Sequence, residues 1–180
     1  MVEGVRVVRD GLPDAARAVR RDVFVAGQGV PESRELDGKD ADATHFLAED
    51  AGEAVGTARL RVLDGGDRGT FVEPEAVFAA GAPVGKVERV AVRAARRGEG
   101  WGRRLMAAVE RAARERGCET VALHGQTRVE DFYERLGYRT VSDVFADADM
   151  PHVEMVKRVS EAGVTLGSRQ TEGDDTRRES

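Results

Sequence analysis

The chain has 180 residues, of which 41% are hydrophobic and 34% charged, and its net charge is −5 at pH 7. This length and apolar content favour one globular domain with a full core, and the negative charge argues against nucleic acid as an electrostatic partner. A single cysteine, Cys118, excludes an intramolecular disulfide and a cysteine-based zinc site. We expect its thiol to be buried and inert, as free cysteines usually are.

The N-terminus does not resemble a targeting segment. Glu3 and Arg6 place charge there, and no apolar stretch of about 18 residues, the length that suggests a membrane span, occurs in the sequence. We therefore expect a cytoplasmic protein without a membrane partner.

Alternating and helical apolar patterns define the expected secondary structure. In chain order they predict a strand at 5–9, a helix at 13–25, a polar loop at 26–43, a hairpin of strands 44–49 and 54–63, a turn-rich break at 64–69, a helical turn near 75–78, a strand at 84–92, a helix at 101–116, a strand at 119–123, a short helix at 129–136 and a final strand pair at 139–145 and 153–159. Burying every apolar stripe of this order requires a mixed α/β fold with a central mixed β-sheet flanked by helices. We assign residues 1–159 to this domain and expect residues 160–180, where apolar residues nearly vanish, to be a disordered tail.

The most informative segment is a glycine-rich turn between the strand 84–92 and the helix 101–116. It reads Arg96-Arg97-Gly98-Glu99-Gly100-Trp101-Gly102-Arg103-Arg104. Glycines at alternate positions free the backbone to turn and to aim successive N–H groups at one point. The helix that follows adds the positive end of its dipole and its unpaired N–H groups. Because ligands of such sheets dock at the carboxyl ends of central strands, this turn predicts a binding site for a pyrophosphate.

Two common nucleotide-binding loops do not fit this turn. The dinucleotide fingerprint requires glycine where Arg103 stands, and the P-loop requires a Gly-Lys-Ser/Thr sequence that is absent. The spacing Arg97-x-x-Gly100-x-Gly102 instead resembles the (Gln/Arg)-x-x-Gly-x-(Gly/Ala) element of the GNAT acyltransferases, which bind acetyl-CoA. The alternative for so short a pattern is a plain turn before a helix.

Further motifs extend the resemblance over residues 3–159 and point to the ElaA-type branch of the GNAT superfamily. They are Val23-Phe24-Val25, Gln28, Pro31, Asp37, Asp40, His45, Ala58-Arg59, Leu123-x-x-Gln126, Phe132-Tyr133-Glu134-Arg135-Leu136-Gly137-Tyr138 and Pro151-His152-Val153-Glu154-Met155. Two departures concern the acceptor side: Gly27 stands where the branch has an acidic residue, and Asp149-Met150 stand where it has Gly-Ile. The resemblance implies the GNAT acyl-CoA N-acyltransferase fold.

The resemblance also implies roles for site residues. Tyr133 would be the general acid that protonates the departing CoA thiolate. The remaining contacts would be made to CoA: the pantetheine and acetyl carbonyl by Val90, Ala91 and Val92, the pantetheine arm by Phe132, and the pyrophosphate by Arg97, Gly98, Glu99, Gly100, Trp101, Gly102 and Arg103. Without the resemblance, Tyr133 would fit the buried face of a short helix.

Acyl transfer from a thioester to an amine needs few protein groups. The amine must be neutral to attack, although free alkylamines have pKa values near 10. The tetrahedral oxyanion requires a donor, for which the N–H of Val92 is suited, and the leaving thiolate benefits from a proton. The reaction requires no metal, so acetyl-CoA is the only co-substrate that we expect.

The general base has several candidates. Glu88 lies two residues before Val90 and is expected on the same strand face, where it could accept the amine proton directly or through water. Its alternative role is that of an ordinary salt-bridged carboxylate. His124 and His152 have a suitable intrinsic pKa, but no fixed spacing links either of them to Tyr133, and each could be structural.

The loop 26–43 is rich in acids, namely Glu32, Glu35, Asp37, Asp40 and Asp42. These residues could attract a cationic amine, or they could be ordinary soluble surface. His45 and Arg59 could orient this loop or line the acceptor cleft. The arginines between positions 93 and 116 alternate with acids, which favours solvated helix surface and contacts with CoA phosphates over nucleic-acid binding.

The leading hypothesis is an N-acetyltransferase that moves an acetyl group from acetyl-CoA to an amine of a small molecule or peptide by direct attack. The alternative is a non-catalytic acyl-CoA sensor or interaction module. Tyr133 beside an intact glycine-rich turn favours the enzyme. An exposed final strand pair could support a homodimer, and the fold does not name the acceptor.

Overall fold

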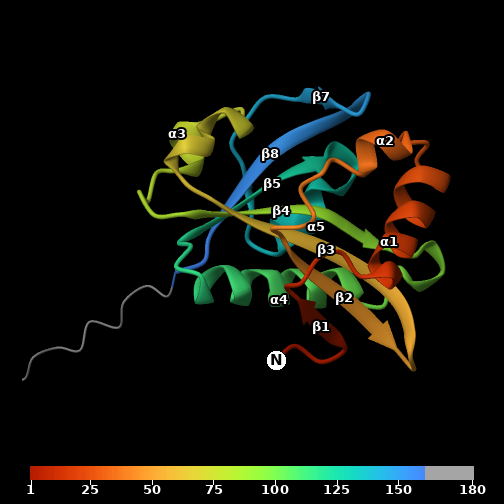
Figure 1. The fold of residues 1–180 in the computed structure, drawn as a ribbon. Coiled ribbons are helices and arrows are strands. Elements are labelled where there is room, and N and C mark those ends of the chain that lie inside the picture. The colour runs from red at the N-terminus through yellow and green to blue at the C-terminus, as the bar shows by residue number, and fades with distance from the viewer. Residues whose placement is uncertain (161–180) are drawn as a thin grey trace, which may run out of the picture.

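The structure is a computed structural model that describes residues 1–160, so the predicted tail beyond Ser160 lies outside the described residues. The strands are β1 (Val5–Val8), β2 (Thr44–Asp50), β3 (Glu53–Leu63), β4 (Val84–Val92), β5 (Thr120–Gln126), β6 (Arg139–Thr140), β7 (Phe145–Asp147) and β8 (Met150–Arg158) (Figure 1). The α-helices are α1 (Asp14–Arg20), α2 (Glu32–Glu35), α3 (Pro74–Val77), α4 (Trp101–Glu115) and α5 (Glu130–Arg135). Within residues 1–160, no helix combines the length and apolar character needed to cross a bilayer.

The described strands form one eight-stranded sheet in the order β1-β2-β3-β4-β5-β8-β6, with β7 also paired to β8. The pair β4–β5 is parallel and the other pairs are antiparallel, which confirms the predicted mixed sheet. β4 and β5 pair only from Val84 opposite Thr120 to Val87 opposite Leu123. Beyond these residues the two central strands separate, and the sheet opens at their carboxyl ends.

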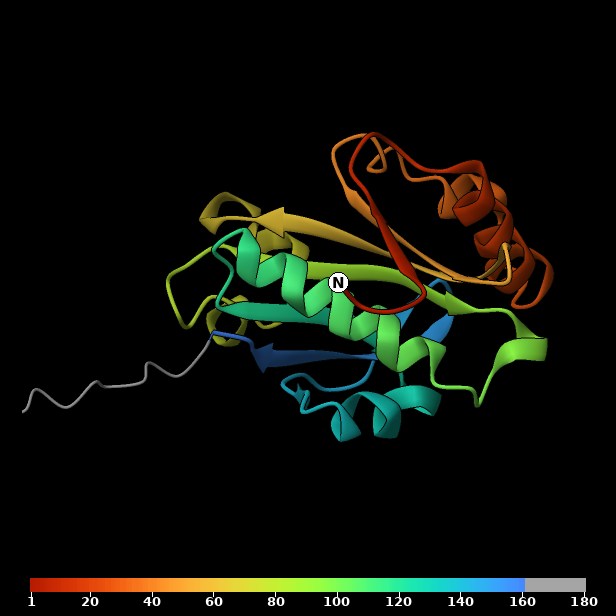
Figure 2. The same cartoon turned by 90° about the horizontal axis from the view of Figure 1, so that it is seen from below.

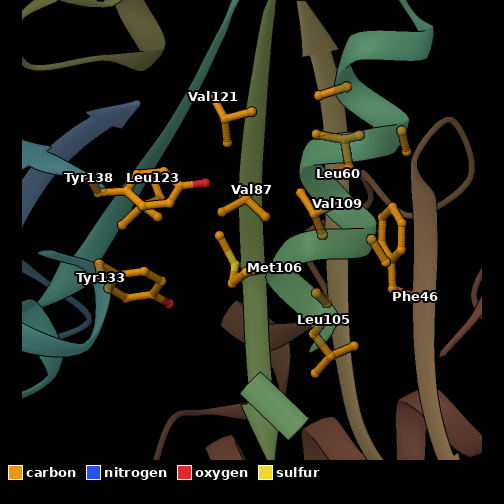
Figure 3. Packing of buried hydrophobic residues seen from close by; sticks show 14 of the residues in the cluster. Phe46, Leu60, Val87, Leu105, Met106, Val109, Val121, Leu123, Tyr133 and Tyr138 are labelled. Carbon is orange, nitrogen blue, oxygen red and sulfur yellow. The ribbon is translucent and has the colours of Figure 1, made fainter. Parts of the chain in front are cut away.

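Helices cover both faces of the sheet. α4 crosses one face, and its apolar side packs on alternate residues of the strands (Figures 2 and 3). This main core includes Phe46, Leu60, Val87, Leu105, Met106, Val109, Val121 and Leu123. On the opposite face, Val19 and Val23 pack against Ala91 of β4. The helix predicted over 13–25 is therefore present, although after Arg20 it continues as a π-helix over Arg21–Ala26.

Two local expectations had different outcomes. Cys118 is a free, buried thiol whose pKa is raised by burial, as expected for an inert cysteine.

The strand predicted over 139–145 is wrong in its middle, because the segment splits into β6 and β7, which both pair with β8. At the break, the Ser142 side chain accepts the N–H of Glu154 at 2.9 Å, in the place of a backbone carbonyl. Serine hydroxyls compete with the backbone in this way and interrupt strands.

Candidate active site

A cleft of about 1020 Å³ opens where β4 and β5 separate. Its lining includes most of the predicted site residues, namely Glu88, Val90, Ala91, Val92, Arg97, Gly98, Gly100, Trp101, Gly102, Arg103, Phe132 and Tyr133, together with His124 and His152. Glu99, His45 and Arg59 are not among the lining residues. The cleft therefore runs from the glycine-rich turn, through the gap between the strands, to the side of the sheet that carries α1 and α2.

A β-bulge bends β4 beside this cleft. The register of β3 against β4 shifts between Thr57 and Arg59, and Arg89 adopts a left-handed φ of 57°. As a result, Glu88 contacts Arg59 on the α1 face, whereas Val90 packs against the main core under α4. The expectation that Glu88 and Val90 share one face was wrong, because alternation holds only in an uninterrupted strand and a bulge inverts it.

The end of β4 directs a backbone donor into the gap. The N–H of Arg93 donates to Val55 O of β3 at 2.8 Å. Since consecutive strand residues direct their backbone groups to opposite sides, the N–H and C=O of Val92 point away from β3 and toward the cleft. Arg97 Nε donates to Val92 O at 3.2 Å, in agreement with this orientation. The Val92 N–H thus faces the side on which an oxyanion would need a donor.

The glycine-rich turn presents a row of unpaired backbone donors. Gly98 and Gly100 have φ values of 81° and 86°, and Gly100 caps the 15-residue helix α4. Among residues 1–160, no carbonyl or side chain accepts a hydrogen bond from the N–H groups of residues 98–103; the first such bond runs from Arg104 to Gly100 at 3.1 Å. These donors lie at the positive end of the α4 dipole, an arrangement that binds anions.

The side chains of the turn fall into two groups. The carboxylate of Glu99 accepts hydrogen bonds from Arg96 Nε and Trp101 Nε1, both at 2.9 Å. The Trp101 ring is buried, so Glu99 and Trp101 would contact a ligand through their backbone. Arg97 and Arg103 are exposed beside the turn and add positive charge there.

The two motif glycines are required for different reasons. A Cβ on Gly102 would lie 3.0 Å from Phe132 Cζ, so glycine there lets α5 pack onto the first turn of α4. A Cβ on Gly100 would meet nothing within 4 Å, and this position instead requires glycine for its left-handed φ. The half-buried Phe132 ring is thereby held between the start of α4 and the cleft.

Tyr133 is buried but its hydroxyl is free. The ring is 8% exposed, packs against Phe132 and Tyr138, and extends from α5 toward β4 in Figure 3. Tyr133 lines the cleft, and its hydroxyl forms no hydrogen bond with a side chain or backbone group of residues 1–160, although it is not fully buried. Burial raises the pKa of the phenol, so the group is protonated at neutral pH and can donate its proton to a strong base.

Arg59 joins three carboxylates on the α1 face of the sheet. Its guanidinium is 0% exposed and lies 2.7 Å from Asp37, 3.0 Å from Asp40 and 2.7 Å from Glu88. Burial by itself would raise the pKa of these acids, but the hydrogen bonds and positive charges that they receive lower it in each case. The buried charges are therefore paired, as the low dielectric of an interior requires.

This pairing favours the salt-bridged alternative for Glu88. Its Oε1 also lies 3.5 Å from both Arg61 and Lys86. Burial would raise its pKa, but the charges of Arg59 and Lys86 lower it, so the carboxylate holds a proton weakly. Glu88 lines the cleft as a fixed negative charge, and its geometry does not favour the role of general base.

The same ion pairs order the acidic loop. Arg20, which is 1% exposed, pairs with Glu35 and Asp40, and His45 Nε2 lies 2.9 Å from the backbone oxygen of Asp40. Four of the five loop acids thus pair with arginines, since Glu32 also pairs with Arg21 at 3.2 Å on the surface. Of the roles open to His45 and Arg59, the structure supports orientation of this loop.

We expect the free energy of unfolding to fall when the solution is acidified. The folded-state pKa values of Asp37, Asp40 and Glu88 are lowered, so their stabilisation is present above the unfolded values of about 4 and is lost as the pH falls through the folded values. Urea titrations at neutral pH and at about pH 3 should show a lower midpoint in acid. An equal midpoint at both pH values would contradict the proposed contribution of these carboxylates.

The comparisons with known proteins agree with this fold. The profile of the acetyltransferase (GNAT) family matches residues 15–138. The uncharacterized N-acetyltransferase YjcF of Bacillus subtilis (strain 168) is 34% identical over 140 residues, which are 77% of this chain and 87% of YjcF. ElaA of Escherichia coli (strain K12) is 29% identical over 143 residues, 78% of this chain and 83% of ElaA.

Solved structures show the same fold. The crystal structure of Escherichia coli ElaA superimposes with a TM-score of 0.68 at 24% identity, covering 86% of this chain and 99% of ElaA. An aminoglycoside 6′-N-acetyltransferase complexed with coenzyme A has a TM-score of 0.63 at 17% identity, covering 88% and 98%. The chain belongs to the acetyltransferase (GNAT) family. ElaA is one of its relatives, which confirms the branch that the motifs indicated.

Proposed function

We propose that the protein is an N-acetyltransferase that transfers the acetyl group of acetyl-CoA directly to an amine of a small molecule or peptide. The observation that supports this most is the row of unpaired N–H groups at residues 98–103, at the mouth of a cleft between two separated strands. Family membership agrees with acyl transfer, and the aminoglycoside acetyltransferase of the same fold is described in complex with coenzyme A.

In this proposal each part of acetyl-CoA has its own contacts. The pyrophosphate lies on the N–H groups of residues 98–103, with charge from Arg97 and Arg103. The pantetheine arm passes Phe132 and enters the gap beside Val90 and Ala91. The Val92 N–H, which points into the cleft, stabilises the oxyanion of the tetrahedral intermediate.

Tyr133 supplies the proton for the leaving thiolate in this proposal. Its phenol is protonated at neutral pH and its hydroxyl is available in the cleft. A non-catalytic sensor would need the CoA contacts but not this proton donor. The free hydroxyl therefore favours the enzyme over the sensor.

Acetyl-CoA at about 100 times its dissociation constant should stabilise the protein by about 2.7 kcal/mol, or roughly 5–10 °C in melting temperature. Gly100→Leu should abolish this shift, because a side chain would stand over the unpaired N–H groups. Gly11→Leu is a matched control, since Gly11 and Gly100 both have φ +86° and open space around them. The control should lose similar stability but keep the shift.

Differential scanning fluorimetry of the three proteins checks this prediction, and thiol release from acetyl-CoA against a panel of amines, polyamines and peptides measures the transfer. Retained stabilisation of Gly100→Leu by acetyl-CoA would show that the pyrophosphate binds elsewhere. Stabilisation of the wild type without thiol release for any amine would favour the sensor.

A further inference from the structure

A histidine–carboxylate pair lies where the central strands part. His124 follows Leu123, the last β5 residue that pairs with β4, and it lines the cleft. Its Nε2 is 2.8 Å from Glu154 Oε1 on β8. Glu154 is 0% exposed, and its two oxygens also accept the N–H groups of Val72 at 2.9 Å and Glu73 at 2.7 Å. The carboxylate is thus fixed from three directions.

These contacts determine which ring nitrogen of His124 can accept a proton. Burial would raise the pKa of Glu154, but the hydrogen bonds from His124 and from the two N–H groups lower it, so the group is an ionised acceptor. A neutral His124 must then carry its hydrogen on Nε2, which leaves the lone pair on Nδ1. Within residues 1–160, Nδ1 has no hydrogen-bond partner and is not a buried atom. The side chain is 16% exposed, on the cleft side.

Aromatic rings hold the imidazole in this orientation. Phe71 and Phe145 pack against it edge to face, with ring centroids at 6.4 and 5.0 Å. A hydrogen-bonded carboxylate behind the ring and apolar groups beside it resemble the arrangement by which a catalytic base is oriented and its imidazolium is stabilised.

His124 and Tyr133 lie on opposite sides of β5. A Cβ on Gly125 would lie 3.4 Å from the Tyr133 ring, so Gly125 faces the tyrosine. His124 is the preceding strand residue, and its side chain therefore points to the other face, toward Phe71. In acyl transfer, the amine and the thiolate occupy different positions on the tetrahedral carbon. A base on one side of the gap and an acid on the other match these two positions.

On the basis of the proposed function, we propose that His124 is the general base of acetyl transfer and that Glu154 is its positioning residue. The amine nitrogen attacks the thioester carbonyl carbon, a C–N bond forms, and the carbonyl electron pair moves to oxygen. Nδ1 of His124 takes the proton released by the amine nitrogen. The C=O bond re-forms, the C–S bond breaks, and the thiolate receives the Tyr133 proton. Solvent then carries one proton from His124 to Tyr133, which restores both groups.

Other titratable groups near the acceptor side of the cleft are less suited to this role. They include His152 and Glu154 of β8, Lys86 and Glu88 of β4, Asp147 of β7, and Glu35 of α2, which is buried and paired with Arg20. Glu88 is shared among cations. His152 Nδ1 lies 2.9 Å from the backbone oxygen of Met150, so His152 lacks the carboxylate that would stabilise an imidazolium. His152 is therefore the comparison that tests the assignment of His124.

The test measures kcat/KM for thiol release across about pH 5.5 to 9.5, with a substrate amine found in the panel. His124→Gln, whose amide Nε2 can still donate to Glu154 but which has no basic nitrogen, should lose on the order of 10²-fold in kcat/KM at neutral pH while keeping the acetyl-CoA melting shift. The residual kcat/KM of this variant should keep rising with pH over the measured range and should not reach the plateau of the wild type, because more of the amine becomes neutral. Added imidazole should partly restore His124→Ala. Glu154→Gln should lower kcat while leaving the KM for the amine nearly unchanged, because the imidazolium formed on proton transfer loses the carboxylate beside it.

His152→Gln should keep the shape of the wild-type pH profile and should not respond to imidazole. A wild type that binds acetyl-CoA but acetylates no amine overturns the proposed function and the base assignment together. If the wild type acetylates an amine and His124→Gln does so at the same rate and with the same pH profile, the base assignment alone is overturned. An acetyl-CoA melting shift of the His124 variant shows that this variant is folded.

Discussion

Replacing Tyr133 with phenylalanine is expected to lower kcat for acetyl transfer by about 10³-fold while leaving acetyl-CoA binding and stability nearly unchanged. The substitution removes only a hydroxyl that has no hydrogen-bond partner among residues 1–160, so the packing of the ring is retained. The leaving thiolate would then depart without a proton donor. Thiol-release kinetics at saturating acetyl-CoA measure the effect.

Tyr138 provides the matched control for this substitution. Its hydroxyl donates to Glu110 Oε1 at 3.0 Å in a buried contact away from the cleft lining. Tyr138→Phe should therefore cost about 1–3 kcal/mol in stability but leave kcat unchanged. Tyr133→Phe is thus expected to lower kcat and keep stability, whereas Tyr138→Phe is expected to lower stability and keep kcat. Wild-type kcat for Tyr133→Phe across the pH range would remove Tyr133 from the role of general acid.

Arg59→Met should destabilise the protein by about 3–5 kcal/mol, because it removes a buried guanidinium and leaves three partly buried carboxylates with fewer partners. In a domain of this size the loss corresponds to a fall in melting temperature on the order of 10 °C. The loop that carries Asp37 and Asp40 should also become more sensitive to limited proteolysis, since Arg59 holds both carboxylates against the sheet and only the contacts of His45 and Arg89 would remain there. Urea denaturation and protease digestion measure both effects.

Arg6→Met is the control for Arg59→Met. Arg6 pairs with Glu49 on the surface, where its side chain is 54% exposed, and such pairs contribute less than about 1 kcal/mol. A loss of stability in Arg59→Met no larger than that of Arg6→Met would show that the buried network does not hold the loop in place.

Local sequence patterns were sufficient to predict the elements that form the proposed CoA side of the site. The strand over 84–92 and the start of the helix at residue 101 agree with the structure, and Gly98 and Gly100 adopt left-handed backbone conformations. The predicted hairpin of strands 44–49 and 54–63 also forms, and its turn has left-handed φ values at Ala51 and Gly52. These features depend on apolar periodicity and on the conformational freedom of glycine, which are properties of neighbouring residues and can be found in one chain.

The acceptor side of the proposed site could not be predicted in the same way, because it depends on contacts between residues far apart in the chain. The bulge at Arg89, which places Glu88 opposite the face expected for it, follows from the pairing of β3 with β4, and no local pattern encodes it. The pairing of the loop acids with Arg20 and Arg59 likewise joins separate elements.

Residue types at short spacing were thus enough to predict the family, most of the elements and the glycine-rich turn. Which ionisable groups are paired and which are free depends on the folded chain. Glu88 proved to be shared among cations, and His124 meets Glu154 across strands 30 positions apart in the chain. A proton affinity depends on burial and on nearby charge, and folding alone brings those charges together.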